Sequence, residues 1–281
     1  MKFAWMAGSR IGSRSYNEDR VLTLHSREAW LLVVADGMGG HLNGELAAQM
    51  VIDTLSHRFE MGARPVLADP QAFLREGLAE IQAALERMAL LRRFPEVPSA
   101  TVAIALVQRG QLYAVWAGDA RAYLLRDGAV LWRSRDHSTV QRLIDCGQLT
   151  PEAALAHPER NRVTSCLGGI DQPEVGEAGP LPLGRGDAVL VCSDGVWSQF
   201  GDEELARALT ARAPQRVVPA LLQVAERRAG ERSDNLSAAA LMPLADDAAG
   251  AEVLDSAQAP EVPDALGATL ESEMLAAGGG L

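Results

Sequence analysis

The sequence predicts an α+β fold, in which strands and helices occupy separate blocks of the chain. Four short apolar runs follow one another between residues 101 and 132, and the turns "QRGQ" and "RDGA" within this stretch are typical of hairpins. Two long segments, 43–60 and 71–91, carry apolar residues at the spacing of one helix face. Successive hairpins indicate antiparallel sheet rather than a doubly wound parallel one.

The first half of the chain has clear local signals. The run 29–35 is continuously apolar, which indicates a strand buried on both faces. Asn43 is a suitable cap for the first long helix. In chain order we expect strands at 3–8, 21–24 and 29–35, helices at 43–60 and 71–91, and strands at 101–107, 111–116, 122–125 and 129–132.

The second half begins with a polar segment, 134–180, which we expect to be irregular apart from two short helices. After it comes the apolar run 188–192, which predicts another core strand. The remaining expected elements are short helices at 139–146 and 151–156, longer helices at 202–211 and 214–229, and a last strand at 236–242.

Charge divides the chain into a body and a tail. The 281 residues carry a formal charge of −11, which disfavours binding to nucleic acid or to an anionic membrane. Eight acidic residues and no lysine or arginine lie in 245–281, a segment rich in alanine and glycine. We therefore expect one folded domain at 1–244 and a disordered acidic tail at 245–281.

Cysteine content and hydropathy suggest where the protein acts. No apolar stretch approaches the ~18–20 residues that a membrane span requires, and the first ten residues do not resemble a signal peptide. The three cysteines, Cys146, Cys166 and Cys192, lack metal-ligand spacing. These features favour a reducing compartment, and we expect a cytoplasmic monomer.

Acidic residues stand beside glycine, asparagine or a turn at the ends of several predicted strands. Isolated carboxylates are costly at a buried sheet edge, and the chain has a single lysine, Lys2, to compensate them. A cluster of hard cations would neutralise them, and ligation by oxygen alone points to Mg²⁺ or Mn²⁺ rather than Zn²⁺. The acidic residues concerned are Glu18, Asp19, Asp36, Asp119, Asp194 and Asp234.

Plainer interpretations exist for parts of this pattern. A single strand followed by Asp-Gly is usually a turn, and for Asp119 a turn and a ligand are equally compatible with the sequence. The stretch "GMGGHLNG" suggests a phosphate-binding loop, but Leu42 stands where the third glycine of a dinucleotide motif should be. It also lacks the lysine of a P-loop.

Taken in order, the motifs resemble those of the metal-dependent serine/threonine protein phosphatases of type 2C, in the wording of their bacterial branch. The similarity extends from about Arg10 to Pro243. It implies a four-layer α-β-β-α sandwich of two antiparallel sheets flanked by helix pairs, with a flap at 134–169 beside the active site. The motifs are "RSYNEDR", "VVADGMGGHLNGELAA", "VWAGDARAYLLRDG", "RDHSTVQRLIDCGQLT", "RNRVTSCLGG", "GDAVLVCSDGVWSQF" and "SDNLS".

The resemblance also implies roles for individual residues. Asp36 would bridge two Mn²⁺ or Mg²⁺ ions, and Asp119 and Asp194 would contribute to a third site. Arg14 would grip the substrate phosphate, because its planar guanidinium matches two phosphate oxygens. The metal-ligating groups it implies are Glu18, Asp36, the Gly37 carbonyl, Asp119, Asp194 and Asp234, with Asp19 either a ligand or a neighbour of one.

The general acid is left open. Animal members have a histidine directly after the Asp-Gly, where this chain has Met38, and the nearest histidine is His41. His41 is a candidate general acid, and a structural role at the start of the helix is an equal alternative. The chain also has "SAT" at 99–101 where the family usually has "GTT", a change that removes no predicted ligand.

The activity implied is hydrolysis of phosphoserine and phosphothreonine in proteins by a water activated at a binuclear Mn/Mg centre. Phosphorylated proteins would be the substrates, and a bacterial Ser/Thr kinase would be the opposing partner. One alternative is a non-catalytic regulator on the same fold that binds metal or phosphopeptide, which the retained ligands and Arg14 disfavour. Another is a phosphatase that uses Asp36 as nucleophile, which needs a second aspartate where Met38 stands.

Overall fold

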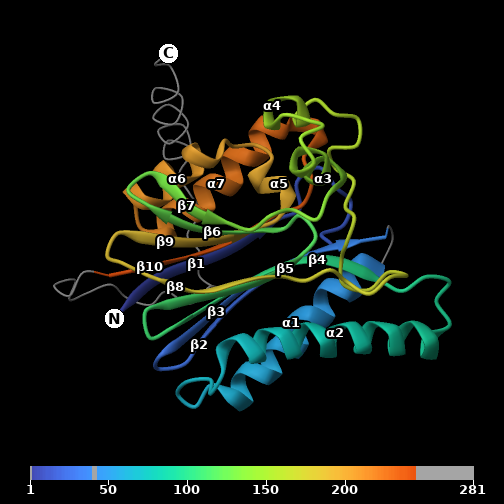
Figure 1. Ribbon diagram of the computed structural model, residues 1–281, viewed down its shortest axis with the longest axis horizontal. Coiled ribbons are helices and arrows are strands. Elements are labelled where there is room, and N and C mark those ends of the chain that lie inside the picture. Colours follow the sequence, from blue (N-terminus) through green and yellow to red (C-terminus); the bar gives the residue numbers. More distant parts are fainter. Residues whose placement is uncertain (1, 40–42, 245–281) are drawn as a thin grey trace.

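The chain folds into two five-stranded antiparallel sheets that face each other and are covered by helices on their outer sides. The structure is a computed structural model that describes residues 2–39 and 43–244, so His41 and the predicted tail at 245–281 lie outside the described residues. Figure 1 shows α6 (Asp202–Ala211) and α7 (Pro214–Ala229) on one side of the sheets and α1 (Asn43–Gly62) and α2 (Pro70–Arg92) on the other. This arrangement confirms the expected α+β sandwich.

The elements include the predicted ones in the expected order, together with an unpredicted strand, Gly176–Pro182, and an unpredicted short helix, Asp194–Trp197. They are β1 (Phe3–Arg10), β2 (Asp19–His25), β3 (Ala29–Met38), α1 (Asn43–Gly62), α2 (Pro70–Arg92), β4 (Ser99–Gln108), β5 (Gln111–Ala117), β6 (Arg121–Arg126), β7 (Ala129–Arg133), α3 (Thr139–Asp145), α4 (Pro151–Ala154), β8 (Gly176–Pro182), β9 (Asp187–Cys192), α5 (Asp194–Trp197), α6 (Asp202–Ala211), α7 (Pro214–Ala229), the 3₁₀ turn η1 (Gly230–Arg232) and β10 (Leu236–Pro243).

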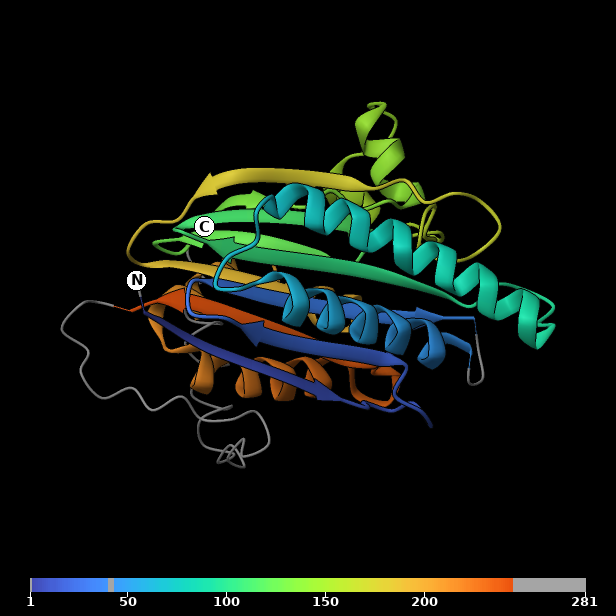
Figure 2. The same cartoon turned by 90° about the horizontal axis from the view of Figure 1, so that it is seen from below.

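The two sheets are joined by a chain crossing that matters for the site. One sheet has the order β1-β10-β9-β6-β7 and the other the order β2-β3-β4-β5-β8. The chain passes from one sheet to the other between β5 and β6, through Gly118, Asp119 and Ala120. Asp119 therefore lies at the border between the sheets. Figure 2 shows the same layers from below, with α3 and α4 protruding from the body of the sandwich.

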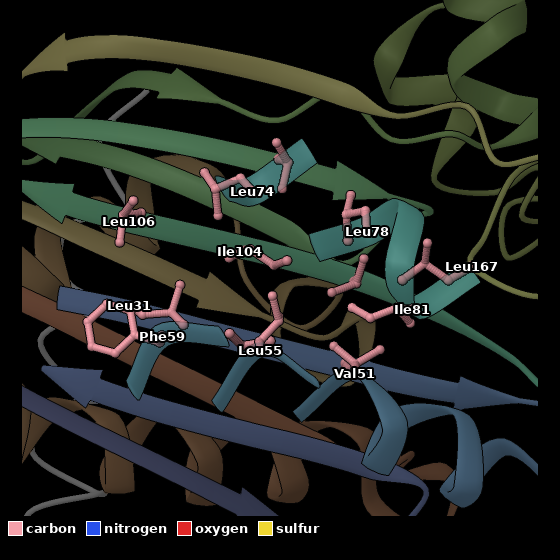
Figure 3. Packing of buried hydrophobic residues seen from close by; sticks show 14 of the residues in the cluster. Leu31, Val51, Leu55, Phe59, Leu74, Leu78, Ile81, Ile104, Leu106 and Leu167 are labelled. Carbon is pink, nitrogen blue, oxygen red and sulfur yellow. The ribbon is translucent and has the colours of Figure 1, made fainter. Parts of the chain in front are cut away.

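Burial explains why β3 is apolar along its whole length. Leu31 and Val33 pack with α1 and α2, while Leu32 and Val34 point into the interface between the sheets. Side chains alternate between the faces of a strand, so a strand covered on both faces needs apolar residues throughout. Figure 3 shows the helix side of this core, where Leu31 lies among residues of α1, α2 and β4.

Several sequence-based boundaries were wrong. The segment 134–180 is not wholly irregular after its short helices, because Gly176–Pro182 forms β8 on β5. This strand escaped prediction because it is short of apolar residues and contains two prolines, which edge strands tolerate. β3 does not end before Asp36 but continues to Met38, with Asp36 paired to Thr101 and Gly37 to Ala100. Asp194 begins the short helix α5, which the sequence did not predict, and Ser193 separates this helix from β9.

Gly37 is a glycine for a steric reason. A Cβ atom at Gly37 would lie 2.2 Å from the carbonyl oxygen of Gly44 in α1, and a Cβ atom at Gly44 would lie 2.7 Å from the carbonyl carbon of Gly37. Two glycines are therefore needed for the first turn of α1 to approach β3 this closely. The contact places the helix start directly beside Asp36.

No helix within the described part of the chain combines the length and the apolar character that crossing a bilayer would require.

Candidate active site

A groove of about 510 Å³ gathers nearly all of the predicted site residues. Its wall includes Arg14, Glu18, Asp36, Gly37, Asp119, Asp194 and Asp234, which the sequence distributes over more than 200 positions. Asn161 and Val163 of the flap also line it. Asp19 is the exception among the described residues, because its side chain is buried beside the groove rather than exposed in it.

Two strands from different sheets deliver the central carboxylates. Asp36 lies near the end of β3, and Asp194 follows β9 at the start of α5. Asp19, the first residue of β2, is paired across the sheet with Asp36. Asp234 directly precedes Asn235 and β10. The site therefore spans the two sheets at one end of the sandwich, and the packing of the sheets determines how far apart the carboxylates are.

Crowding of acidic groups strongly perturbs Asp36. Its carboxyl is enclosed by protein although it faces the groove, and this burial raises its pKa well above the ordinary aspartate range. Asp19, Asp194 and Asp119 raise the pKa further by repulsion. A hydrogen bond links the side chains of Asp36 and Asp194. Burial and the neighbouring Asp234 raise the pKa of Asp194 to about 6.

Asp19 has one satisfied and one unsatisfied oxygen. Its Oδ2 accepts a hydrogen bond from the hydroxyl of Ser193 at 2.8 Å. Its Oδ1 is buried and makes no hydrogen bond to any of the described residues. Burial raises the pKa of Asp19 to about 7, against the opposing effect of the nearby hydroxyl groups of Ser193 and Ser237. A buried acceptor without a donor fits a position beside a bound cation.

The donor set suits a hard divalent metal. The groove offers carboxylates and the carbonyl group of Gly37, with no thiol or imidazole among the described residues of its wall. Among residues 2–39 and 43–244, no group of three or more Asp, Glu, His or Cys side chains has the geometry of a metal-binding site. Asp36 and Asp194 contact each other, and Asp234 contacts Arg14. The oxygen donors and the unsatisfied Oδ1 of Asp19 fit Mn²⁺ or Mg²⁺.

Arg14 stands at the rim of the groove. Its Nη2 lies 2.7 Å from Oδ2 of Asp234, and the side chain is 61% exposed. Its guanidinium is thus accessible to a ligand in the groove while it is held near the acidic cluster.

Two residues that the sequence analysis did not single out organise this rim. Asn235 is buried, accepts a hydrogen bond from the backbone N–H of Glu18 at 2.8 Å, and donates to the carbonyls of Ile11 and Tyr16 at 2.8 and 2.9 Å. Ser193 donates to Asp19 and accepts from the backbone N–H of Ser237. Both residues are neighbours of predicted ligands in "SDN" and "CSDG", and this adjacency was the available signal.

The chain also matches a known protein family. Residues 8–239 match the sequence profile of the family described as protein phosphatase 2C. The chain belongs to that family. This confirms the resemblance found in the sequence.

Relatives in this family include bacterial serine/threonine phosphatases. The chain is 37% identical over 220 residues to the serine/threonine protein phosphatase PstP of Mycobacterium tuberculosis, a match that covers 77% of this chain and 40% of that protein. It therefore spans well under half of the length of that relative. It is 27% identical over 201 residues to the serine/threonine phosphatase stp of Listeria monocytogenes, covering 71% of this chain and 79% of that one.

Solved structures show the same phosphatase 2C fold. The crystal structure of the Mycobacterium tuberculosis serine/threonine phosphatase PstP/Ppp superposes with a TM-score of 0.74 at 31% identity, over 85% of this chain and 98% of that chain. The catalytic domain of PstP, solved in complex with two manganese ions, gives a TM-score of 0.71 at 30% identity, over 85% of this chain and 97% of that chain.

The phosphatase 2C groove predicts an unusual pH dependence of stability without metal. Asp19 and Asp194 have pKa values raised to about 7 and about 6 in the folded state, against an ordinary value near 3.8. A raised folded pKa means that the folded state binds protons more tightly, so this contribution is full below about pH 4 and is lost as pH rises through about 6–7. We expect the Tm in chelator to fall between about pH 5.5 and pH 8.

Scanning fluorimetry in EDTA, with and without excess Mn²⁺, measures this effect. Asp19→Asn should flatten the fall, because it removes one of the protons that the folded state holds. Saturating Mn²⁺ should do the same by neutralising the carboxylates. A Tm that rises with pH in chelator would show that the acidic groups are not confined together as the structure indicates.

Proposed function

We propose that this chain is a protein serine/threonine phosphatase that hydrolyses phosphoserine and phosphothreonine with divalent metal ions. One observation carries the proposal: Arg14 lines the same groove as the predicted metal-ligating carboxylates and carbonyl, which come from both sheets. An acidic cluster alone would repel phosphate. A guanidinium at its rim gives the groove an anion-binding group beside the cation-binding ones.

The proposed division of ligands follows the family resemblance, and all of the groups concerned line the groove. Asp36 would be shared between two ions, Asp194 and Asp234 would hold one of them, and Glu18 and the Gly37 carbonyl would hold the other. When bound, such ions lower the pKa of water and neutralise charge on the phosphate. The manganese ions in the PstP catalytic domain support Mn²⁺ as the metal. Asp119 and Asp194 would serve a third ion.

The residues of the chain supply the rest of the chemistry. Arg14 binds and orients the phosphate through paired N–H donors, which stabilises the charge that develops in the transition state. Asp19 and Asn235 hold the ligands in place, the first opposite Asp36 on the neighbouring strand and the second through the backbone of Glu18. His41, the candidate general acid, stays a proposal, since it lies outside the described residues.

The wider role is proposed from the same family relationship. The substrates would be phosphorylated proteins, as the names of the relatives suggest. A bacterial Ser/Thr kinase would be the opposing enzyme. The flap at 134–169, which borders the groove through Asn161 and Val163, would influence substrate choice. We also propose a cytoplasmic monomer whose catalytic domain is 1–244, with the predicted acidic tail at 245–281 outside the described residues.

Metal removal tests the proposed activity directly. We expect hydrolysis of p-nitrophenyl phosphate and of a phosphothreonine peptide in Mn²⁺, and loss of both activities in EDTA, because every predicted ligand is a hard oxygen donor. Re-addition of Mn²⁺ should restore the rates. Full activity after exhaustive chelation would contradict the metal mechanism. Metal binding by calorimetry without any hydrolysis would favour the non-catalytic regulator instead.

A further inference from the structure

Beside the groove, six residues, of which only Asp119 lines it, form a closed series of contacts that ties three active-site segments together. We call this series the contact ring. It joins the crossing between the sheets, the short helix that begins with Asp194, and the start of the flap. Its members are Gly118, Asp119, Arg121, Asp136, His137 and Trp197.

The first side of the ring links the crossing to α5. The indole N–H of Trp197 donates a hydrogen bond of 2.8 Å to the carbonyl oxygen of Asp119. Trp197 ends the same four-residue helix that Asp194 begins. The side chain of Trp197 thus connects the backbone at Asp119 to the helix that begins with Asp194. These two carboxylates repel each other, and the charge of Asp194 raises the pKa of Asp119 beyond the effect of burial.

The second side runs through Arg121. Its guanidinium carbon lies 3.5 Å from the centroid of the Trp197 ring, which is the geometry of a stacked cation–π contact. The same guanidinium donates two hydrogen bonds to Asp136, from Nε at 2.8 Å and from Nη2 at 2.7 Å. Both side chains are largely buried, at 12% and 6% exposure. Arginine is needed here because only a planar fork can stack and bind a carboxylate at once.

The third side returns to the crossing through the start of the flap. His137 follows Asp136, and its Nδ1 accepts a hydrogen bond of 3.2 Å from the N–H of Gly118. The N–H of His137 donates to the carbonyl of Gly118 at 2.8 Å, and its carbonyl accepts from Thr164 farther along the flap at 2.7 Å. Gly118 has φ of +102°, a conformation that suits glycine. Its two hydrogen bonds to His137 fix the backbone of the crossing against the start of the flap.

We propose that Arg121 is a positioning residue that acts through Trp197 and Asp136 to set the placement of Asp119 relative to Asp194 and to the flap. Arg121 is not part of the described wall of the groove. Arg121 would act on Asp119 and Asp194, the two carboxylates that would share a cation. That they share a cation rests on the proposed function. Partners that orient metal ligands commonly change affinity or activity by about 10- to 100-fold when they are removed.

The chain contains a matched control on the same strand. Arg126, at the far end of β6, makes the same double contact with a buried aspartate, donating to Asp187 at 2.5 and 2.8 Å. Arg126 and Asp187 do not line the groove. Arg121→Met and Arg126→Met therefore each replace an arginine of β6 whose guanidinium binds a buried carboxylate, that of Asp136 or of Asp187. Only Arg121 belongs to the contact ring.

The test compares Arg121→Met, Arg121→Lys and Arg126→Met with the unaltered protein. Calorimetry measures the number and affinity of Mn²⁺ sites, fluorimetry the Tm, and p-nitrophenyl phosphate turnover the split between kcat and KM. We expect Arg121→Met to weaken the weakest Mn²⁺ site and to lower kcat by roughly 10-fold or more. KM should change by less than about threefold, because the phosphate-binding Arg14 is untouched. Arg121→Lys should lie between.

Arg126→Met should lower the Tm about as much as Arg121→Met does, while its Mn²⁺ affinity and kcat stay close to those of the unaltered protein. A second variant, Trp197→Phe, keeps an aromatic face for Arg121 but removes the N–H that bonds to Asp119, so it should weaken the same Mn²⁺ site. Equal effects of Arg121→Met and Arg126→Met on Tm, kcat and Mn²⁺ binding would overturn the proposal, since Arg121 would then only stabilise the fold. If the unaltered protein shows no Mn²⁺-dependent activity, the proposed function fails instead, and the calorimetric comparison still tests the ring.

Discussion

Replacing Asp36 with asparagine is expected to lower kcat on a phosphothreonine peptide by at least ~10²-fold, the largest loss we expect from a single change. Asp36 is surrounded by other acidic residues. Burial is the main cause of its raised pKa, and the charges of Asp19, Asp194 and Asp119 raise the pKa further. An amide there cannot supply the negative charge that two divalent ions need. Steady-state kinetics in saturating Mn²⁺ measure the loss.

The same change should stabilise the metal-free protein. Asp36→Asn would remove one of several mutually repelling carboxyl groups without creating a cavity, so the Tm in EDTA at pH 8 should rise. Asp187→Asn is a suitable contrast, because Asp187 is fully buried, paired with Arg126 and outside the groove. It should lower the Tm and leave kcat nearly unchanged. A folded Asp36→Asn variant with a normal rate would show that Asp36 is only a strand residue.

Arg14→Ala is expected to cut kcat/KM for phosphorylated substrates by roughly 10- to more than 100-fold, the size of a lost charge-assisted bidentate contact. Its Mn²⁺ affinity should stay close to that of the unaltered protein or rise slightly. The reason is the ion pair of 2.7 Å between Arg14 and Asp234, which competes with a cation for that carboxylate. Because the side chain is mostly exposed, the Tm should hardly change.

Arg10 offers a matched control for this prediction. It is similarly exposed, at 47%, and pairs with Glu226 at 2.6 Å rather than with a residue of the groove. Arg10→Ala should leave both Mn²⁺ affinity and kcat/KM unchanged. Calorimetry beside kinetics on one phosphopeptide separates the outcomes. If Arg14→Ala abolishes Mn²⁺ binding yet turns over normally at saturating Mn²⁺, then Arg14 organises the ligand loop and does not grip phosphate.

Much of the fold was predictable because its signals are local. Helix α2 shows this well: an apolar stripe predicted it at 71–91, and the structure has Pro70–Arg92 with Asp69 as its N-cap. β8 was not predictable, because an edge strand with glycine and proline owes its existence to hydrogen bonds with β5 rather than to its own pattern. The continuation of β3 through Asp36 likewise depends on its pairing with β4.

The acidic residues of the site could be nominated from the sequence alone, since a carboxylate at the end of an apolar strand is conspicuous. Their supporting residues could not. Ser193 bonds to Asp19 across 174 positions, and Trp197 bonds to Asp119 across 78. Nothing near Trp197 or Arg121 in the sequence reveals these partners, because a stacked guanidinium or an indole donor is recognisable only when its acceptor is known.

By itself the sequence determined the fold class, the order of most elements and the chemical type of the site, because periodicity, turn residues and side-chain charge are properties of neighbouring positions. The tertiary structure alone decided that Asp19 lies buried opposite Asp36 while the other acids face the groove, and that Arg14 rests on Asp234. It also decided the contact ring. The physical reason is that burial, repulsion and pKa arise from distances between residues far apart in the chain, and these distances exist only once the two sheets have packed.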